Sequence, residues 1–233
     1  MKSETPISID QIKIDKSAFE NLLDVFTDKI SVVELKNYEI HLSGTVNIDV
    51  FNKSYKFENC TFINGRIDFY DFHYKNENKV DFHTVEFQDC EIQSDLYIKD
   101  CKLYKVNFGT CKISSKNFHI SSSEITYIRF NASAGNYMEI QNLNLHQLND
   151  KKTIVEFTHC DIGHLFLKNC DFKKTFFVST ITADLEITAC NFLEEFVFSK
   201  SSIGQIFKIQ KTSFHTSTFF KANLGLLTDF RNC

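Results

Sequence analysis

The chain has 233 residues, 42% of them hydrophobic, and a formal net charge of -4, which suits one or two domains. The mild charge, with no basic patch, argues against a nucleic-acid-binding protein. No apolar run approaches the roughly 18 to 20 residues of a membrane span, and the first ten residues lack the apolar core of a secretory signal, so we expect a cytoplasmic protein.

An alternating apolar stretch opens the chain and predicts a short strand, with isoleucine at positions 7, 9, 12 and 14. An amphipathic helix is predicted from Lys16 to Asp28, where Ser17 and Glu20 fit a capping box. Its apolar face consists of Phe19, Leu22, Leu23 and Phe26. We expect residues 1–32 to cover the first coil of a repeat array, because terminal repeats need a cap. Docking of a partner helix is the alternative role.

From Val33 to Cys233 the sequence repeats in units of about ten residues. The clearest units are VEFTHCDI, LFLKNCDF, TFFVSTIT and LEITACNF, between Val155 and Phe192. In each of them, apolar or small residues occupy relative positions 1, 3, 6 and 8. Two polar runs interrupt the repeat, at Lys75 to Lys79 and at His146 to Lys152, and we expect both to form loops.

The eight cysteines all occupy the sixth position, where other units carry Ser, Thr or Ala. They are Cys60, Cys90, Cys101, Cys111, Cys160, Cys170, Cys190 and Cys233. A place that accepts these residue types selects small volume, so we interpret the cysteines as small buried hydrophobes rather than disulfide partners. Paired Cys or His at the short spacing of a zinc site are absent from the sequence, and no metal or other cofactor is expected.

The spacing predicts a polygonal coil. Two inward residues separated by one residue share a face of extended backbone, and the next two residues turn a corner. Each side therefore takes five residues, and four sides make a coil of about 20 residues. Stacked coils pair as parallel strands about 4.8 Å apart. The array accommodates about nine coils, and Phe62, Phe82, Phe172 and Phe192 are expected to stack along its axis.

The units NCDF, ACNF and KANLG resemble pentapeptide repeats, which carry a small residue at the first inward place and Phe or Leu at the centre. The resemblance extends over roughly Val33 to Cys233 and implies an all-β solenoid, a right-handed quadrilateral parallel β-helix. Some proteins of that family mimic DNA and bind type II topoisomerases such as gyrase. Mimicry requires a long negative surface, which a charge of -4 with a balanced second half does not favour.

The most enzyme-like cluster is formed by His159, Cys160, Asp161 and His164. In the repeat, Cys160 points inward while His159 and Asp161 point outward or lie at a corner, which separates the nucleophile from its base. No phosphate-binding loop, dinucleotide fingerprint or nucleophile elbow is present in the sequence, so we expect no enzymatic activity.

The leading hypothesis is a scaffold that binds a protein partner through an outer face or through the two loops. The loop residues that we expect to make contact are Asn76, Glu77, Asn78, His146, Gln147, Asp150, Lys151 and Lys152. An assembly or sensor domain of a longer effector is a related possibility. A repeat centre at Cys233 with no cap behind it also predicts self-association through this end.

Overall fold

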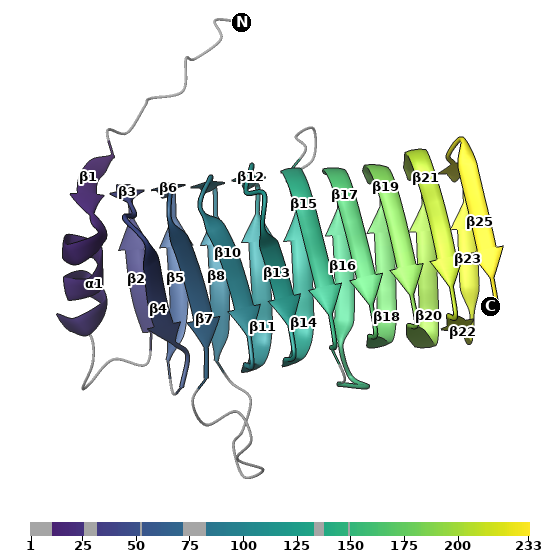
Figure 1. Cartoon of the computed structure of the whole chain (residues 1–233), viewed down its shortest axis with the longest axis horizontal. Coiled ribbons are helices and arrows are strands. Elements are labelled where there is room, and N and C mark those ends of the chain that lie inside the picture. The colour runs from purple at the N-terminus through teal and green to yellow at the C-terminus, as the bar shows by residue number, and fades with distance from the viewer. Residues whose placement is uncertain (1–10, 26–31, 52, 72–82, 133–137, 149) are drawn as a thin grey trace, which may run out of the picture.

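The computed structural model describes residues 11–25, 32–51, 53–71, 83–132, 138–148 and 150–233. They form a right-handed parallel β-solenoid of about nine turns, which confirms the fold predicted from the repeat. The coils stack along the long axis of the molecule, with α1 (Lys16–Val25) at one end and β25 (Leu227–Arg231) at the other (Figure 1).

Among the described residues the strands form two sheets, both parallel. The fifteen strands of sheet A are β1 (Ile12–Asp15), β3 (Tyr38–His41), β4 (Thr45–Asp49), β6 (Thr61–Ile63), β7 (Arg66–Tyr70), β9 (Glu91–Ile92), β10 (Asp95–Lys99), β12 (Lys112–Ile113), β13 (Phe118–Ser121), β15 (Met138–His146), β17 (Cys160–Lys168), β19 (Ile181–Thr188), β21 (Ser202–Gln210), β24 (Asn223–Leu224) and β25. The ten strands of sheet B are β2 (Val32–Lys36), β5 (Ser54–Glu58), β8 (Thr84–Gln88), β11 (Lys102–Gly109), β14 (Glu124–Asn131), β16 (Ile154–Thr158), β18 (Asp171–Val178), β20 (Asn191–Ser199), β22 (Ser213–Phe214) and β23 (Ser217–Phe220).

Each coil contributes two sides to sheet A and two to sheet B. In one coil, Cys160–Ile162 and His164–Lys168 form the sheet A sides, since both parts of β17 pair with β15. The two parts of β18 form the sheet B sides and pair with β20. Val155 pairs with Thr175, so this coil spans the 20 residues that four five-residue sides require.

In the second half of the array, left-handed residues mark two corners of each coil and directly precede the small place of the repeat. Their φ angles lie near +50°, and between His159 and Asn232 they recur every ten or eleven residues. None of the residues in this series is glycine, and they include Asn169, Ser179, Ala189 and Lys200. Asn tolerates this conformation better than other residues with a side chain, whereas Ala and Lys adopt it at a cost of about 1–2 kcal/mol each.

A continuous stack of phenylalanine rings fills the core on the sheet B side. Successive ring centroids lie 4.8 to 5.2 Å apart, one ring for each coil. The stack consists of Phe57, Phe87, Phe108, Phe130, Phe157 and Phe177. These residues occupy the third position of the repeat, not the eighth position from which we predicted the stack.

The phenylalanines predicted to stack are buried but do not form one column. Phe172 stacks on Phe192 at 5.6 Å, because β18 and β20 are neighbours in sheet B. Phe62 is fully buried on β6 of sheet A, and position 82 lies outside the described residues. The expected inward orientation is therefore confirmed for the three described residues, whereas their common stack is wrong.

The helix α1 covers the first coil, as predicted, although its N-cap differs from the prediction. Asp15 caps the helix by accepting a hydrogen bond from the backbone N–H of Ala18 at 2.9 Å. The helix begins at Lys16, directly after β1, which places Ser17 within its first turn and not at the cap. Phe19 is fully buried against Phe57 and Phe62 of the core. The predicted last turn, 26–28, lies outside the described residues.

The second polar run is shorter as a loop than its sequence suggests. His146 is the last residue of β15, and Gln147 adopts the left-handed corner conformation with a φ of 53°. Leu148 is fully buried and takes the place that a small residue fills elsewhere. The loop therefore begins after Leu148 and closes where Thr153 donates a hydrogen bond to the carbonyl of Asp150 at 2.9 Å.

Candidate interaction surfaces

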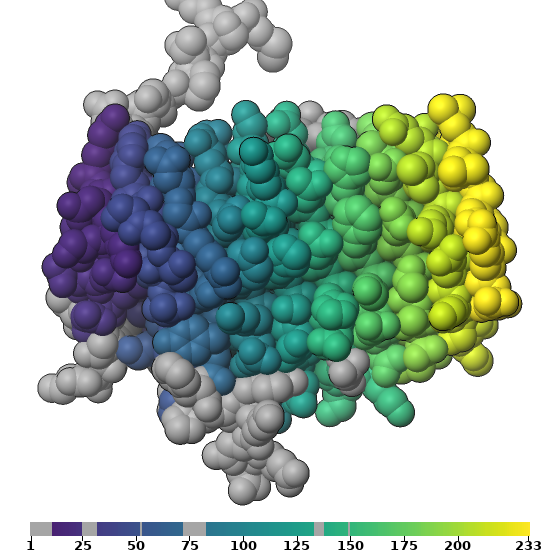
Figure 2. Space-filling view, in the orientation of Figure 1, coloured from purple at the N-terminus to yellow at the C-terminus, as the bar shows by residue number. Residues whose placement is uncertain are grey.

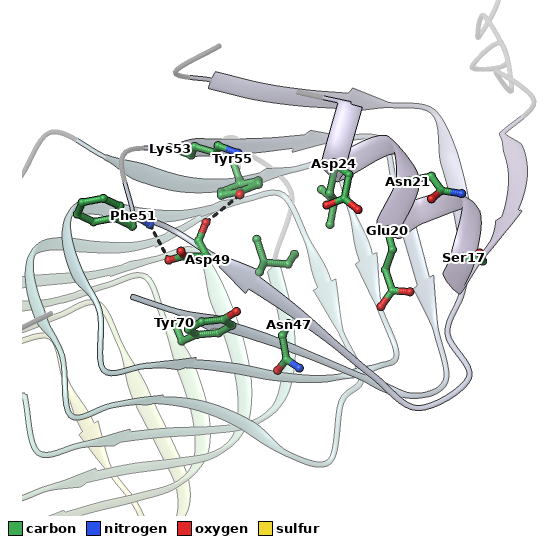
Figure 3. A pocket seen from close by; sticks show the side chains of 12 residues that line it. Ser17, Glu20, Asn21, Asp24, Asn47, Asp49, Phe51, Lys53, Tyr55 and Tyr70 are labelled. Atoms are coloured by element: carbon green, nitrogen blue, oxygen red, sulfur yellow. Dashed lines mark hydrogen bonds between the residues drawn. The ribbon is translucent and has the colours of Figure 1, made fainter. Parts of the chain in front are cut away.

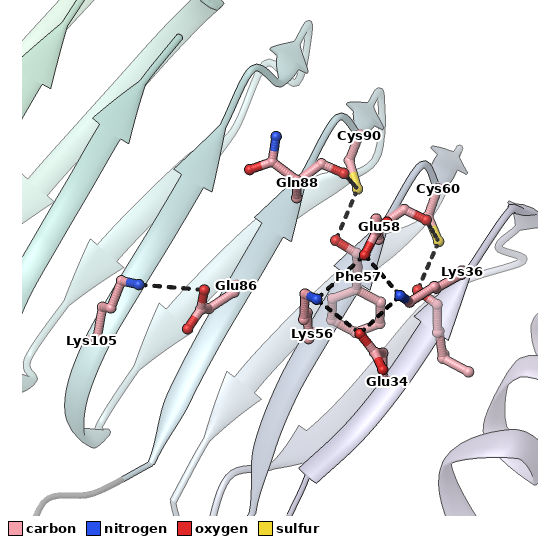
Figure 4. A network of polar contacts seen from close by, with 11 residues as sticks. Glu34, Lys36, Lys56, Phe57, Glu58, Cys60, Glu86, Gln88, Cys90 and Lys105 are labelled. Carbon is pink, nitrogen blue, oxygen red and sulfur yellow. Dashed lines mark hydrogen bonds and ion pairs between the residues drawn. The ribbon is translucent and has the colours of Figure 1, made fainter. Parts of the chain in front are cut away.

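Charged side chains on the outer face of sheet B pair along the solenoid axis. Lys56 lies 2.8 Å from Glu34 of the preceding coil, and Lys36 lies 3.1 Å from Glu58 of the following coil (Figure 4). Hydrogen bonds from Lys56 and then Lys36 lower the pKa of Glu34 below its ordinary value. These contacts join neighbouring coils, so this face carries alternating charge rather than one sign.

The same pairing continues toward the middle of sheet B. Lys105 contacts Glu86 at 3.4 Å, and Arg129 contacts Glu156 at 2.6 Å. Exposed pairs of this kind contribute little stability each, about 0 to 1 kcal/mol. The pairs give this part of the face both signs of charge rather than one.

The seven buried cysteines occupy the small place and are all free thiols. Each is hydrogen-bonded as well as small: the Sγ of Cys170 donates to the carbonyl of Lys168 at 3.2 Å. Thr180 and Ser201 make the corresponding hydroxyl bonds, to the carbonyls of Val178 and Ser199. Burial raises the pKa of Cys160 to about 12, so this thiol is unsuited to act as a nucleophile.

The enzyme-like cluster is separated as the repeat predicts. Cys160 is buried, whereas His159 lies at a left-handed corner and Asp161 is exposed on the outer face. His164 instead contacts Asp184 of the next coil, at 2.7 Å between Nδ1 and Oδ2. Within the described part of the chain, no group of three or more His, Cys, Asp or Glu side chains is placed to hold a metal ion.

A cavity of about 530 Å³ lies between α1 and the first coils. Glu20 and Asp24 approach it from the helix, and Asn47, Asp49 and Tyr70 from β4 and β7 (Figure 3). Tyr55 is buried in its wall, where its hydroxyl donates to the carbonyl of Asp49 at 2.9 Å, and burial raises its pKa. The described lining contains neither His nor Cys, so it offers no imidazole or thiol for covalent catalysis.

Large apolar side chains are exposed together on the last coil, residues 213–231, which we call the terminal coil. Leu226 is 91% exposed, Leu227 59%, and Phe220 and Phe230 52% each. Phe219 is also exposed, although it packs obliquely on Phe196 and Phe198 of the coil before. The terminal coil forms one end of the molecule, opposite the helix (Figure 2). The terminal coil is therefore the part of the described chain in which large exposed apolar side chains concentrate.

The loop residues predicted to bind a partner are placed only in part. Residues 76–78 lie outside the described residues. Among the others, Lys151 and Lys152 are exposed, while His146, Gln147 and Asp150 belong to the strand end, the corner and the closing turn. Sequence reasoning did not single out Leu226, Leu227 or Phe230, because they follow the same apolar pattern as buried residues elsewhere.

Comparison with known proteins finds no matching family model and no matching curated relative. Within the described residues, no helix is long and apolar enough to cross a membrane.

Proposed function

We propose that this chain is a non-enzymatic scaffold for protein–protein association, with the terminal coil as its principal contact surface. The observation that carries the proposal is the concentration of exposed Leu and Phe side chains on that coil, including Leu226 at 91% exposure. Burial of such side chains against a partner contributes about 25 cal/mol for each Å² of apolar surface.

The rest of the molecule suits a rigid support. Phenylalanine stacking, small hydrogen-bonded residues at the corners and charge pairs each link one coil to the next. A scaffold of this kind holds its contact surface in one conformation before binding, which reduces the entropy lost on association.

The proposal includes an evolutionary relationship between this chain and the pentapeptide-repeat proteins. It is supported by the four-sided coil and by the ten-residue unit with its small inward residue. Mimicry of DNA is the alternative that this kinship suggests, and the paired charges of Glu34, Lys56 and their neighbours do not favour it. A gyrase supercoiling assay tests that alternative, since a mimic would inhibit or protect the enzyme in proportion to the protein added.

Site-specific photo-crosslinking tests the proposal. A photoreactive phenylalanine analogue replaces Leu226 in one variant and Leu193, which is 37% exposed on a lateral face, in a control. In cells that naturally produce the chain, we expect protein adducts from position 226 and few from position 193. Equal or absent adducts at position 226 would contradict the proposal.

The predicted loops are tested in the same cells. Replacement of residues 76–78 and 150–152 by Gly and Ser leaves the terminal coil unchanged. Retention of the adducts at position 226 would assign the contact to the terminal coil, and their loss would assign it to the loops.

A further inference from the structure

We infer that the cavity between α1 and the first coils binds an elongated organic cation, in which an aliphatic chain carries two or more ammonium groups. This site is separate from the terminal coil, so the inference goes beyond the proposed function and does not depend on it. Four features support it: carboxylates on two walls, the distance between them, a second cavity that adjoins the first, and apolar side chains in the lining.

The helix turns a polar stripe toward the cavity. Ser17, Glu20, Asn21 and Asp24 line it, and their spacing of three or four residues places them along one side of α1. Glu20 contacts Lys16 at 3.6 Å, in a pair that is partly exposed. Exposed pairs contribute little stability, so a ligand ammonium can replace Lys16 there. The helix therefore offers two carboxylates to a cation.

Asp49 supplies a third carboxylate from the opposite wall, at the end of β4 (Figure 3). Its Oδ1 accepts a hydrogen bond from the backbone N–H of Phe51 at 3.0 Å, which fixes the direction of the carboxylate. Burial first, and the charge of Asp49 second, raise the pKa of both Tyr55 and Tyr70. Lys53 is the one basic residue in the described lining, so negative charge prevails in the cavity.

The carboxylates face one cavity from separate places. Glu20 and Asp24 lie four residues apart, or about 6 Å along the helix axis. Asp49 approaches from another element. An ammonium group binds a carboxylate through a short charge-assisted hydrogen bond, and each such bond occupies one place. Ammonium groups joined by an aliphatic chain therefore match this arrangement of charges.

A second cavity of about 460 Å³ adjoins the first, because Asn47 and Tyr70 line both. Asp71 and Asp100, which follow β7 and β10, line it together with Lys99. The Lys99 ammonium already contacts a carboxylate on β7 at 3.7 Å. We call the two cavities together the acidic groove. Its extent past the ends of three strands suits a ligand that is long rather than compact.

Apolar side chains complete the lining of the first cavity. They are Leu23, Ile48 and the ring of Phe51. Methylene groups of a polyamine gain by leaving water against such side chains, and an ammonium over an aromatic ring gains a cation–π contact. The volume of 530 Å³ also lies within the range of about 300–1,000 Å³ that is usual for small-ligand sites.

Isothermal titration calorimetry of the 233-residue chain with spermidine, at physiological ionic strength, tests the inference. We expect saturable binding of one spermidine per chain. The variant Glu20→Gln with Asp49→Asn should bind about tenfold more weakly, because it removes two charge-assisted hydrogen bonds. The amide oxygen at position 49 can still accept the Phe51 hydrogen bond, so the wall keeps its shape. Circular dichroism establishes that each variant is folded.

A matched pair of single variants tests the second cavity. Asp100→Asn removes a carboxylate from the acidic groove, whereas Asp161→Asn removes one from an exposed position on β17. We expect Asp100→Asn to weaken spermidine binding several-fold and Asp161→Asn to bind as the parent does. If Asp100→Asn also binds as the parent does, the elongated ligand is overturned.

Two further titrations identify the source of the ammonium groups and exclude a general attraction of counterions. Tighter binding of a lysine tripeptide than of spermidine would assign the groups to a protein segment, and weaker binding would assign them to a free polyamine. Equal displacement of spermidine by magnesium chloride at the same positive charge overturns the site. No saturable binding, or equal loss in the double variant and in Asp161→Asn, overturns it as well. The crosslinks at position 226 are unaffected by these results, so the scaffold is judged separately.

Discussion

Phe157 lies parallel to Phe177 of the next coil, with ring centroids 4.8 Å apart and an angle of 12° between the planes. Both rings are fully buried and belong to the stack that runs through six coils. Phe157 lies on β16 and Phe177 on the neighbouring strand β18, 20 residues later, so the contact links two successive coils. Stability of the solenoid therefore depends on each ring supporting the next.

Removal of one ring from this stack should destabilise the whole protein. We expect Phe157→Ala to lower the free energy of unfolding by about 3–5 kcal/mol, through lost burial and the cavity left between two coils. Urea denaturation monitored by circular dichroism measures the change. Leu193→Ala, at an exposed position, should cost less than about 0.5 kcal/mol, and equal effects of the two substitutions would contradict the inward assignment of Phe157.

Ser201 should matter for its hydroxyl group and not only for its size. Its Oγ accepts a hydrogen bond from the backbone N–H of Thr180 at 3.0 Å and donates to the carbonyl of Ser199 at 2.9 Å. Ser201→Ala leaves both groups without this partner in a buried corner, which should cost about 1–3 kcal/mol in chemical denaturation. Ser114→Ala, at an exposed site, serves as the control. No loss from Ser201→Ala would show that small volume alone suffices.

Two glycines of the same outer row should respond differently to Ala. A Cβ at Gly163 would lie 2.5 Å from the carbonyl oxygen of Gln141, whereas the nearest atom to a Cβ at Gly204 is the Cα of Ala183 at 3.7 Å. We expect Gly163→Ala to lower the free energy of unfolding by about 1–3 kcal/mol and Gly204→Ala to have little effect. Thermal melts of the two variants provide the comparison, and a ranking in the opposite order would contradict the close contact.

Acid should weaken the fold partly through His119, whose ring stacks on Tyr97 at 4.9 Å. Burial lowers its pKa from 6.5, and the nearby charges of Arg66 and His146 act in the same direction while Asp95 opposes them. The folded state therefore disfavours the protonated ring. This contribution is complete above pH 6.5, the unfolded value, and is lost as the pH falls through the lower folded pKa.

The variant His119→Phe keeps an aromatic ring beside Tyr97 but does not titrate. We expect its stability to change less than that of the parent between pH 7.5 and pH 5, as measured by urea denaturation at each pH. Some dependence should remain, because burial also lowers the pKa of His146. Identical pH profiles for parent and variant would contradict the role assigned to His119.

The spacing predicted five-residue sides and a coil of about 20 residues, and the resemblance to pentapeptide repeats supplied the right-handed, four-sided solenoid. The corner residues were harder to predict from the sequence, since Ala189 and Lys200 adopt a left-handed conformation that residues with their side chains do not favour. Stacking of coils imposes it on them. The length of the second loop was overestimated for a related reason. Gln147 occupies a left-handed corner and Leu148 a core place, and both places usually carry other residue types.

The contact surface was predicted only in outline. The local pattern of Leu226 matches that of residues that are buried elsewhere in the array, so its exposure could not be predicted from that pattern. The hydrogen bonds made by residues at the small place were also missed. The available signal was that Cys, Ser and Thr all carry a hydrogen-bond donor, in addition to being small.

The left-handed corners have a consequence for the length of the molecule. Between His159 and Asn232 they recur every ten or eleven residues whatever residue occupies them, so this part of the array is built from whole coils of nearly constant length. Excision of residues 155–174, one coil by the pairing of Val155 with Thr175, would bring the helical end and the apolar end closer by about 4.8 Å without altering either. Duplication of the same segment would separate them by the same step. The distance between the two ends is therefore set by the number of coils.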